Sequence, residues 1–195
     1  MNIRRKVFFD EVRQGLFGRT LTQGQVEGME AILDEWEDRG LTDLRWLAYM
    51  LATVKWETAH TMQPIEEYGK GEGRKYGIPD PETGETYYGR GYVQLTWKEN
   101  YAKMSRLLGV DLVKIPSLAL NELIATQILF EGMLKAESGV GDFTGVSLER
   151  YFNDTTEDWV NARRIINHTD KAQEIANIGH RFYDALLKAT EVTTV

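Results

Sequence analysis

The sequence has no cysteine and only three histidines among its 195 residues, and acidic side chains outnumber basic ones. Without cysteine the chain can form no disulfide, no thiolate metal site and no thiol nucleophile. Thirty acidic residues against 23 basic ones give a net charge of −7. This balance argues against a nucleic-acid partner, because phosphate binding relies on clustered Lys and Arg. It also provides no polybasic patch for a membrane surface.

Long hydrophobic runs are also missing. The chain begins with a basic stretch, but the apolar run after it is too short for the core of a signal peptide. No segment approaches the length of a membrane span. We therefore expect no stable association with membranes, and a substrate outside the cytoplasm would require another component to release the protein.

Familiar metal and phosphate motifs are absent as well. The segment Glu57-Thr58-Ala59-His60 lacks the first histidine of a zinc-binding HExxH motif, so a satisfied or surface role suits the histidines better. The segment 89–91, Gly-Arg-Gly, lacks the glycine spacing and the Lys-Ser/Thr pair of a phosphate loop. Neither zinc chemistry nor nucleotide binding is indicated.

Apolar residues at helical spacing predict a mostly helical protein. A short helix is expected over 6–18, and Thr22 with Gln25 has the pattern of a capping box for a second helix that runs to about Trp36 and ends at Gly40. Thr42 is the expected N-cap of a third helix. Further helices are predicted over 98–109, 117–138, 147–152, 156–166 and 170–189, the last with Asp170 as its N-cap.

Glu57 falls on the continuation of the third helix, seven residues after Met50 and three after Val54. This spacing places it on or beside the buried face, next to Trp56. Burial disfavours the charged form of a carboxyl, and a general acid must carry its proton near neutral pH. The alternative is a glutamate at a helix end that points to solvent, which is the more common case on pattern alone.

Glu66 is a candidate partner for Glu57. On one continuous helix the two carboxyls would lie about half a revolution apart, but Pro64 disfavours helix at Gln63, so a turn is expected between them. A turn would let the two carboxyls face each other across a cleft, as inverting glycosidases require. The alternative is that Glu66 and Glu67 are simply a solvated pair in a loop.

The stretch 66–87 is rich in Gly, Pro and charged residues and reads as a long loop, a feature that is more often functional than idle. Aromatic and β-branched residues then dominate 86–97, interrupted by glycines, which indicates short strands. Aromatic rings with Gln, Thr and Asn over 87–101 suit sugar binding, and a packed β-hairpin is the alternative.

Three segments resemble glycoside hydrolase family 19, the chitinase-like lysozymes. The segment 56–59, Trp-Glu-Thr-Ala, is similar to the family's His-Glu-Thr motif, with Trp56 in place of His. The segment 87–97, YYGRGYVQLTW, followed by Asn100 and Tyr101, is the longest and most specific match. The segment 162–167 ends in Arg-Ile-Ile-Asn, although His168 and Thr169 replace the family's next two glycines. The layout of nearly the whole chain resembles phage endolysins of this group.

The resemblance implies roles for individual residues. Glu57 would protonate the glycosidic oxygen, Glu66 would be the base for the attacking water, and Thr96 would help to hold that water. Because Glu67 adjoins Glu66, the base stays open by one residue. No metal or organic cofactor is implied. The residues that would bind the sugar or shape the cleft around it are Tyr88, Arg90, Gln94, Asn100, Tyr101 and Asn167.

The resemblance also implies the architecture: an α+β fold, predominantly α-helical, with a lysozyme-like two-lobed cleft and a small β-hairpin or sheet beside it. We expect one catalytic domain over 1–195. Its residues 1–41 would form a helical segment packed on the rest, and 66–97 would form a lobe of loop and β-hairpin.

The implied function is that of an endolysin, which hydrolyses the β-1,4 bond between N-acetylmuramic acid and N-acetylglucosamine in peptidoglycan. The protein would be a monomer that stays in the host cytoplasm until a holin releases it to the cell wall. A chitinase and a lytic transglycosylase are the enzymatic alternatives, and a non-catalytic wall-binding or virion protein is the alternative from another class.

Overall fold

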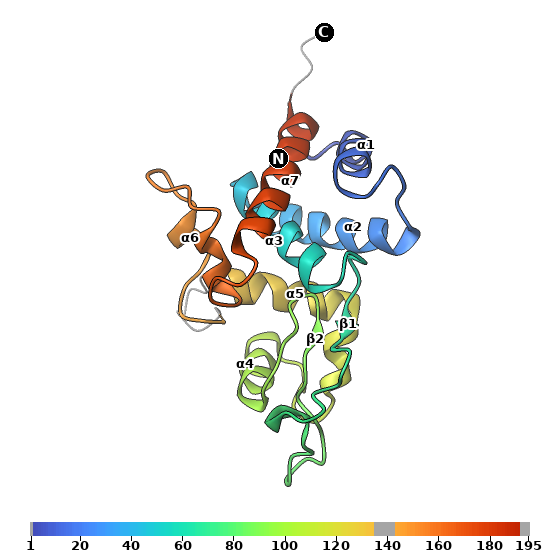
Figure 1. Cartoon of the computed structure of the whole chain (residues 1–195), viewed down its shortest axis with the longest axis vertical. Helices are drawn as coiled ribbons and strands as arrows, with labels where there is room; N and C mark the ends of the chain where they lie inside the picture. Colours follow the sequence, from blue (N-terminus) through green and yellow to red (C-terminus); the bar gives the residue numbers. More distant parts are fainter. Residues whose placement is uncertain (1, 135–142, 192–195) are drawn as a thin grey trace.

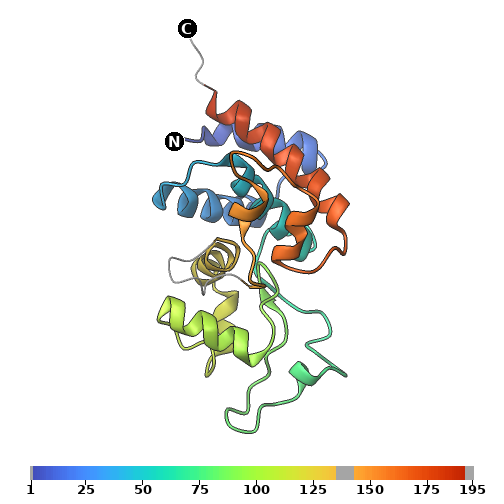
Figure 2. The same ribbon diagram turned by 90° about the vertical axis from the view of Figure 1, so that its left-hand side faces the viewer.

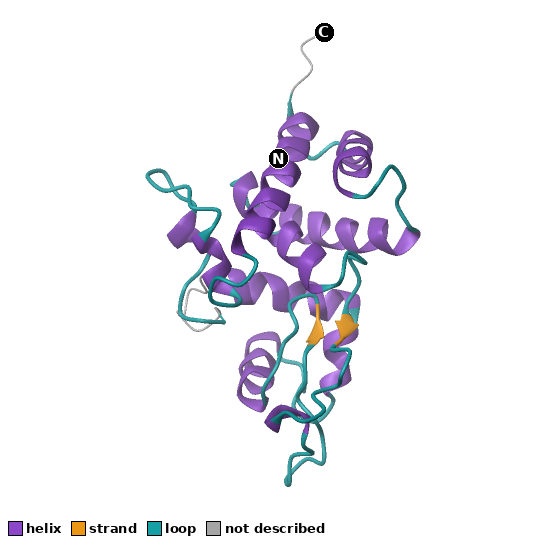
Figure 3. Ribbon diagram, viewed as in Figure 1, coloured by secondary structure: helices purple, strands orange, loops and turns teal. Residues whose placement is uncertain are grey.

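The computed structural model describes residues 2–134 and 143–191. Helices dominate these residues, and the only regular sheet within them has two short strands (Figures 1 and 3). The α-helices are α1 (Arg5–Leu16), α2 (Gln23–Asp38), α3 (Leu44–Glu57), α4 (Lys98–Leu108), α5 (Glu122–Met133), α6 (Leu148–Tyr151) and α7 (Ala172–Thr190). The strands are β1 (Ile65–Glu66) and β2 (Arg90–Gly91), and the 3-10 helices are η1 (Lys75–Gly77), η2 (Pro116–Leu120) and η3 (Asn161–Ile165).

The first helices form where the local signals predict them. The capping box of α2 is confirmed: the Gln25 amide N–H donates to the Thr22 hydroxyl at 3.2 Å, and the Gln25 side chain accepts from the Thr22 N–H at 2.9 Å. The prediction of Thr42 as the cap of α3 is wrong by one residue. Asp43 is the N-cap, because its carboxylate accepts from the backbone N–H of Arg45 at 3.0 Å.

Helix α3 lies at the centre of the molecule, and this positions the site at its end. Its residues from Leu47 to Val54 are almost fully buried, and α7 packs against both α3 and α1 (Figure 2). The ring of Tyr49 contacts Phe152 and Trp159, with centroids 5.7 and 6.3 Å away. A helix buried on all sides is a rigid support, so the residue at its C-terminal end has a fixed position.

The β-hairpin predicted within 86–97 does not form the two-stranded sheet. Instead β2 pairs with β1, antiparallel, with Ile65 opposite Gly91 and Glu66 opposite Arg90. Only an isolated bridge joins Arg90 and Leu95 inside the stretch. Gly91 and Gln94 have φ angles of 87° and 54°, a left-handed backbone that cannot continue a ladder. The chain therefore folds back after two paired residues.

The predicted helices of the second half are present in part. The stretch 117–138 is divided between η2 and α5, with a new cap at Asn121, and its residues beyond 134 lie outside the described part. The stretch 156–166 contains only η3. Asp170 is not the cap of α7, because Lys171 takes that position with a φ of 58° and no side-chain cap bond. The Asp170 carbonyl instead accepts from Nε of Arg163 at 3.0 Å.

The elements form two regions joined by α5 (Figures 1 and 2). One contains α1, α2, α3 and α7, and the other contains the two strands, α4 and the loop between the strands. The predominantly helical α+β fold with a small sheet is confirmed. Within the described residues, none of the helices combines the length and the apolar character needed to cross a membrane.

Candidate active site

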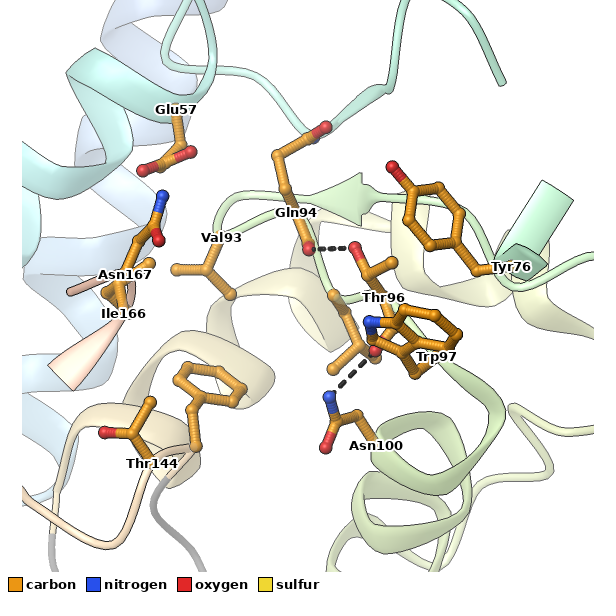
Figure 4. A pocket seen from close by; sticks show the side chains of 12 residues that line it. Glu57, Tyr76, Val93, Gln94, Thr96, Trp97, Asn100, Thr144, Ile166 and Asn167 are labelled. Atoms are coloured by element: carbon orange, nitrogen blue, oxygen red, sulfur yellow. Dashed lines mark hydrogen bonds between the residues drawn. The ribbon is translucent and has the colours of Figure 1, made fainter. Parts of the chain in front are cut away.

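A cleft of about 470 Å³ opens at the C-terminal end of α3 (Figure 4). The stretch 93–100 forms one wall, and residues from 143–144 and 166–167 form the other. Glu57 is the only carboxylate among the described residues that line it. The lining residues are Glu57, Tyr76, Val93, Gln94, Leu95, Thr96, Trp97, Asn100, Phe143, Thr144, Ile166 and Asn167.

Glu57 is the last residue of α3, and the turn after it is firmly held. The Thr58 hydroxyl donates to the Val54 carbonyl at 2.7 Å and accepts from the Met62 N–H at 3.1 Å. The side chain of Glu57 is 16% exposed. The alternative of a freely solvated glutamate at a helix end therefore does not hold.

Arg163 is the partner of Glu57 that the sequence did not reveal. Its guanidinium is 3% exposed, and Nη1 donates to Oε1 of Glu57 at 2.6 Å. A second bond, from Nε to the Asp170 carbonyl, fixes the plane of the group. Arg163 directly precedes the Arg-Ile-Ile-Asn motif within the segment 162–167, and its carbonyl accepts from the N–H of Asn167. That motif was the available signal, but it did not specify which carboxylate the arginine would contact.

Glu66 lies on β1, outside the lining of this cleft, with 34% of its side chain exposed. That its carboxyl faces Glu57 across the cleft stays a prediction. The Tyr88 hydroxyl donates to its Oε1 at 2.6 Å, and Nζ of Lys70 is 3.0 Å from Oε2. The bonds from Tyr88 and then Lys70 hold the pKa of Glu66 below its ordinary value. A carboxylate kept ionised in this way suits a base.

Glu67 has a different environment from its neighbour. Its Oε1 accepts from the Tyr76 hydroxyl at 3.1 Å, and its Oε2 accepts from the N–H of Gly89 at 3.1 Å. Both carboxylate oxygens are thus used in hydrogen bonds that connect Glu67 to the loop segments at Tyr76 and Gly89. Between the two candidates for the base, this arrangement favours Glu66.

Three of the expected sugar-binding residues are instead buried beneath Glu66. Tyr88, Arg90 and Tyr101 do not line the cleft. The Arg90 guanidinium stacks 3.6 Å from the Tyr88 ring centroid, and its Nη1 donates to the Tyr101 hydroxyl at 3.0 Å. Nε of Arg90 is 3.9 Å from Oε1 of Glu66. Their expected direct contact with sugar is corrected to support of the segment around Glu66, because they are buried and lie outside the lining of the cleft.

The polar residues Gln94, Thr96 and Asn100 line the cleft as expected, and they brace its wall. The Thr96 hydroxyl donates to the Gln94 carbonyl at 2.7 Å, and Nδ2 of Asn100 donates to the Thr96 carbonyl at 2.8 Å. Since the hydroxyl hydrogen of Thr96 is used, its oxygen is free to accept a bond from water or sugar. A side chain on Gly89 would place Cβ 2.9 Å from Oε1 of Gln94, so a larger residue there would displace the Gln94 side chain.

Gln94 also connects the cleft to Glu66. Its Nε2 donates to the carbonyl of Ile65 at 3.1 Å, so the residue directly before Glu66 is attached to the cleft wall. On the opposite side, Asn167 lines the cleft next to Glu57 (Figure 4). His168, in place of the family's glycine, has a φ of 23°. The lining of the cleft thus combines one carboxyl with several amides and hydroxyls.

Comparison with known proteins shows similarity to chitinases in sequence and in fold. Residues 67–135 match the sequence model of the family described as chitinase class I. Basic endochitinase B of Arabidopsis thaliana is 45% identical over 42 residues, which are 22% of this chain and 12% of that protein. A second endochitinase of the same plant is 33% identical over 84 residues, 41% of this chain and 28% of that protein. The matched region is therefore only a small part of these relatives.

Solved structures are similar over much more of the chain. Chitinase C from Streptomyces griseus has a TM-score of 0.58 and 19% identity, and the alignment covers 98% of this chain and 79% of that one. The class IV chitinase of family 19 from Zea mays has a TM-score of 0.57 and 16% identity, with 93% and 94% covered. This chain therefore has the fold of the family 19 chitinases, and its residues 67–135 match their class I in sequence.

Proposed function

We propose that this protein is a glycoside hydrolase that cleaves the β-1,4 bond between N-acetylmuramic acid and N-acetylglucosamine in peptidoglycan. The observation that carries the proposal is Glu57, a carboxyl fixed at the end of a buried helix and lining a cleft rich in amides. The fold of family 19 chitinases and the class I match over 67–135 support hydrolysis of a glycan of N-acetylated sugars.

Glu57 is arranged to act as the general acid. Its Oε1 is held by Arg163, while within the described residues no hydrogen bond is found for Oε2. Oε2 is then the oxygen that carries the proton to the glycosidic oxygen of the leaving sugar. Once the proton has left, the guanidinium of Arg163 stabilises the carboxylate, because a charge-assisted bond is stronger to an anion than to a neutral acid.

Glu66 is the proposed base. It is kept ionised by Tyr88 and Lys70, and it follows Ile65, whose carbonyl is bound to the cleft residue Gln94. Glu66 takes a proton from a water molecule, the water attacks the anomeric carbon, and the configuration inverts. The free lone pairs of the Thr96 hydroxyl accept a bond from the same water.

The proposed biological role is lysis of a bacterial host, with the monomeric enzyme released from the cytoplasm through a holin pore. This role rests on the resemblance of the layout to phage endolysins. Chitin is the second candidate substrate, favoured by the names of the relatives, which are endochitinases. The two polymers share their β-1,4 backbone and differ in the lactyl and peptide groups of peptidoglycan.

The test is the variant Glu57→Gln, assayed on purified peptidoglycan and on soluble chitin oligosaccharides. We expect the rate to fall by about 1,000-fold on whichever glycan is cleaved, since removing a general acid costs about 10² to 10⁴ in rate. Glu27→Gln is the matched control, because Glu27 is exposed on α2, outside the cleft. An unchanged rate in Glu57→Gln would mean that the catalytic acid has been misassigned.

A further inference from the structure

A second hollow, of about 340 Å³, continues the cleft beyond Asn167. Thr144, Ile166 and Asn167 line both spaces, so the two form one groove that runs past Glu57. Figure 4 shows these three residues on the side of the cleft that carries Glu57. The remaining lining residues of the second hollow are Val146, Arg150, Tyr151, Arg164 and His168.

This end of the groove is positively charged. Arg150 and Arg164 are both exposed, and within the described part of the chain no carboxylate lies within 4 Å of either. Arg164 makes one side-chain bond, from Nε to Oδ1 of Asn161 at 3.2 Å, which leaves its two terminal nitrogens available. Two available guanidinium groups beside one hollow stand out in a chain whose net charge is −7.

The charged end of the groove and the cleft at Glu57 are connected through two consecutive residues, Arg163 and Arg164. Arg163 points inward to Glu57, and the next residue, Arg164, points outward to the second hollow. The Thr144 hydroxyl lies 2.9 Å from the Arg164 carbonyl and 3.1 Å from the Ile165 carbonyl, which joins the two walls. A glycan whose backbone passes Glu57 would therefore bring its neighbouring side groups to these arginines.

We propose that Arg150 and Arg164 form a subsite for carboxylates carried on the side groups of the glycan strand. Guanidinium groups pair with carboxylates through parallel N–H bonds, and Arg is the residue best suited to this recognition. Chitin has no carboxylate, whereas peptidoglycan has them on its lactyl groups or its stem peptides. The inference rests on the proposed function and names what selects the substrate of the same site.

Binding to the inactive Glu57→Gln protein tests the subsite without any turnover. Calorimetry compares a peptidoglycan tetrasaccharide with stem peptides, the same tetrasaccharide without peptides, and an N-acetylglucosamine tetramer. Adding Arg150→Gln and Arg164→Gln should weaken binding of the peptide-bearing ligand about fivefold more than binding of the tetramer, equivalent to about 1 kcal/mol. The pair Arg74→Gln and Arg106→Gln, which removes two exposed arginines outside the groove, is the control for net charge.

The ligands distinguish the two sources of carboxylate. A loss with the peptide-bearing ligand identifies a carboxylate of the stem peptide, because the lactyl carboxyls of that ligand form the amide bonds to the peptides. A loss with the peptide-free ligand alone identifies the free lactyl carboxylate. Equal losses with all three ligands, or no loss, would overturn the subsite. Turnover by the unmodified enzyme is measured separately, so that failure to cleave either glycan counts against the proposed function and the ratio of affinities decides the subsite.

Discussion

The two ends of the groove are built from different chemistry. At one end, Tyr76 and Trp97 meet edge to face at 5.1 Å, Trp97 is 46% exposed, and both residues also line an adjoining hollow of about 460 Å³. Lys98 in that hollow is paired with Asp80 and Glu82. At the other end, the two arginines have no such partners among the described residues. One end offers aromatic faces to sugar rings, and the other offers charge.

The difference between the two ends of the groove corresponds to the part of the sequence that forms each end. The segment that matches class I chitinases, 67–135, contributes the aromatic end and the residues Gln94, Thr96 and Asn100. Glu57, Arg163 and the charged end lie outside that segment. We infer that the matched segment recognises the sugar backbone that chitin and peptidoglycan share, while the charged end distinguishes between them. Substitutions of residues that lie between the two ends should then lower the cleavage rates of both glycans equally.

Glu66→Gln is expected to have the largest effect of the variants that sharpen this comparison. Loss of the base should lower kcat about 1,000-fold on every glycan that the enzyme cleaves, since a general base contributes about 10² to 10⁴ in rate. Glu67→Gln is the matched control, because Glu67 has the same charge one position away and its oxygens are used by Tyr76 and Gly89. If Glu67→Gln were the more damaged enzyme, the assignment of the base would move by one residue.

Arg163→Lys should lower kcat about 100-fold on both glycans, at the low end of the range for acid–base catalysis, and leave KM nearly unchanged. Lysine keeps the charge but loses the second bond to the Asp170 carbonyl, so it positions Glu57 less well. Steady-state kinetics and the melting temperature are measured together, with Arg106→Lys, an exposed position on α4 outside the groove, as the control. A rise in KM without a fall in kcat would show that Arg163 does not act through Glu57.

Trp97→Ala tests the aromatic end. Removing the exposed indole should raise KM about tenfold, equivalent to about 1.4 kcal/mol, for both the chitin and the peptidoglycan oligosaccharides. Tyr68→Ala is the control, because Tyr68 is 88% exposed and does not line the cleft. A loss confined to one glycan would break the comparison, since it would assign discrimination to the aromatic end.

Tyr88→Phe should give the smallest change, a shift of the pH profile. The Tyr88 hydroxyl is the largest of the causes that lower the pKa of Glu66, so its removal raises that pKa. Glu66 must be ionised to act as a base, and activity is lost as the pH falls through its pKa. The acid limb of kcat/KM should therefore move to higher pH, with Tyr68→Phe as the control. If the acid limb did not move, the ionisation of Glu66 would not control the rate.

Local signals in the sequence predicted most of the helical framework. The capping box of Thr22 and Gln25, and the apolar spacing that led to Glu57, depend on neighbouring residues, which is why α2 and α3 form as expected. The pairing of β1 with β2 was missed because it joins segments 25 positions apart and has only two residue pairs, too few to leave a pattern. Strand pairing is decided by contacts that single-sequence periodicity does not contain.

Five of the residues to which the resemblance gives roles, Glu57, Gln94, Thr96, Asn100 and Asn167, line the cleft, while the roles themselves stay predictions. Partnerships between distant segments were not predicted. Arg163 and Glu57 are 106 positions apart, and only the tertiary fold brings them together. Tyr88, Arg90 and Tyr101 have side chains that suit sugar binding, but the fold buries them, and burial cannot be read from residue type.

The central claim is inverting hydrolysis with Glu57 as the acid. The most direct measurement is proton NMR of the first products released from defined peptidoglycan oligosaccharides, with Glu57→Gln as the blank. The account predicts new reducing ends that appear first as the α-anomer, and none from Glu57→Gln. Reducing ends that appear first as the β-anomer, or 1,6-anhydro ends without a reducing group, would contradict it.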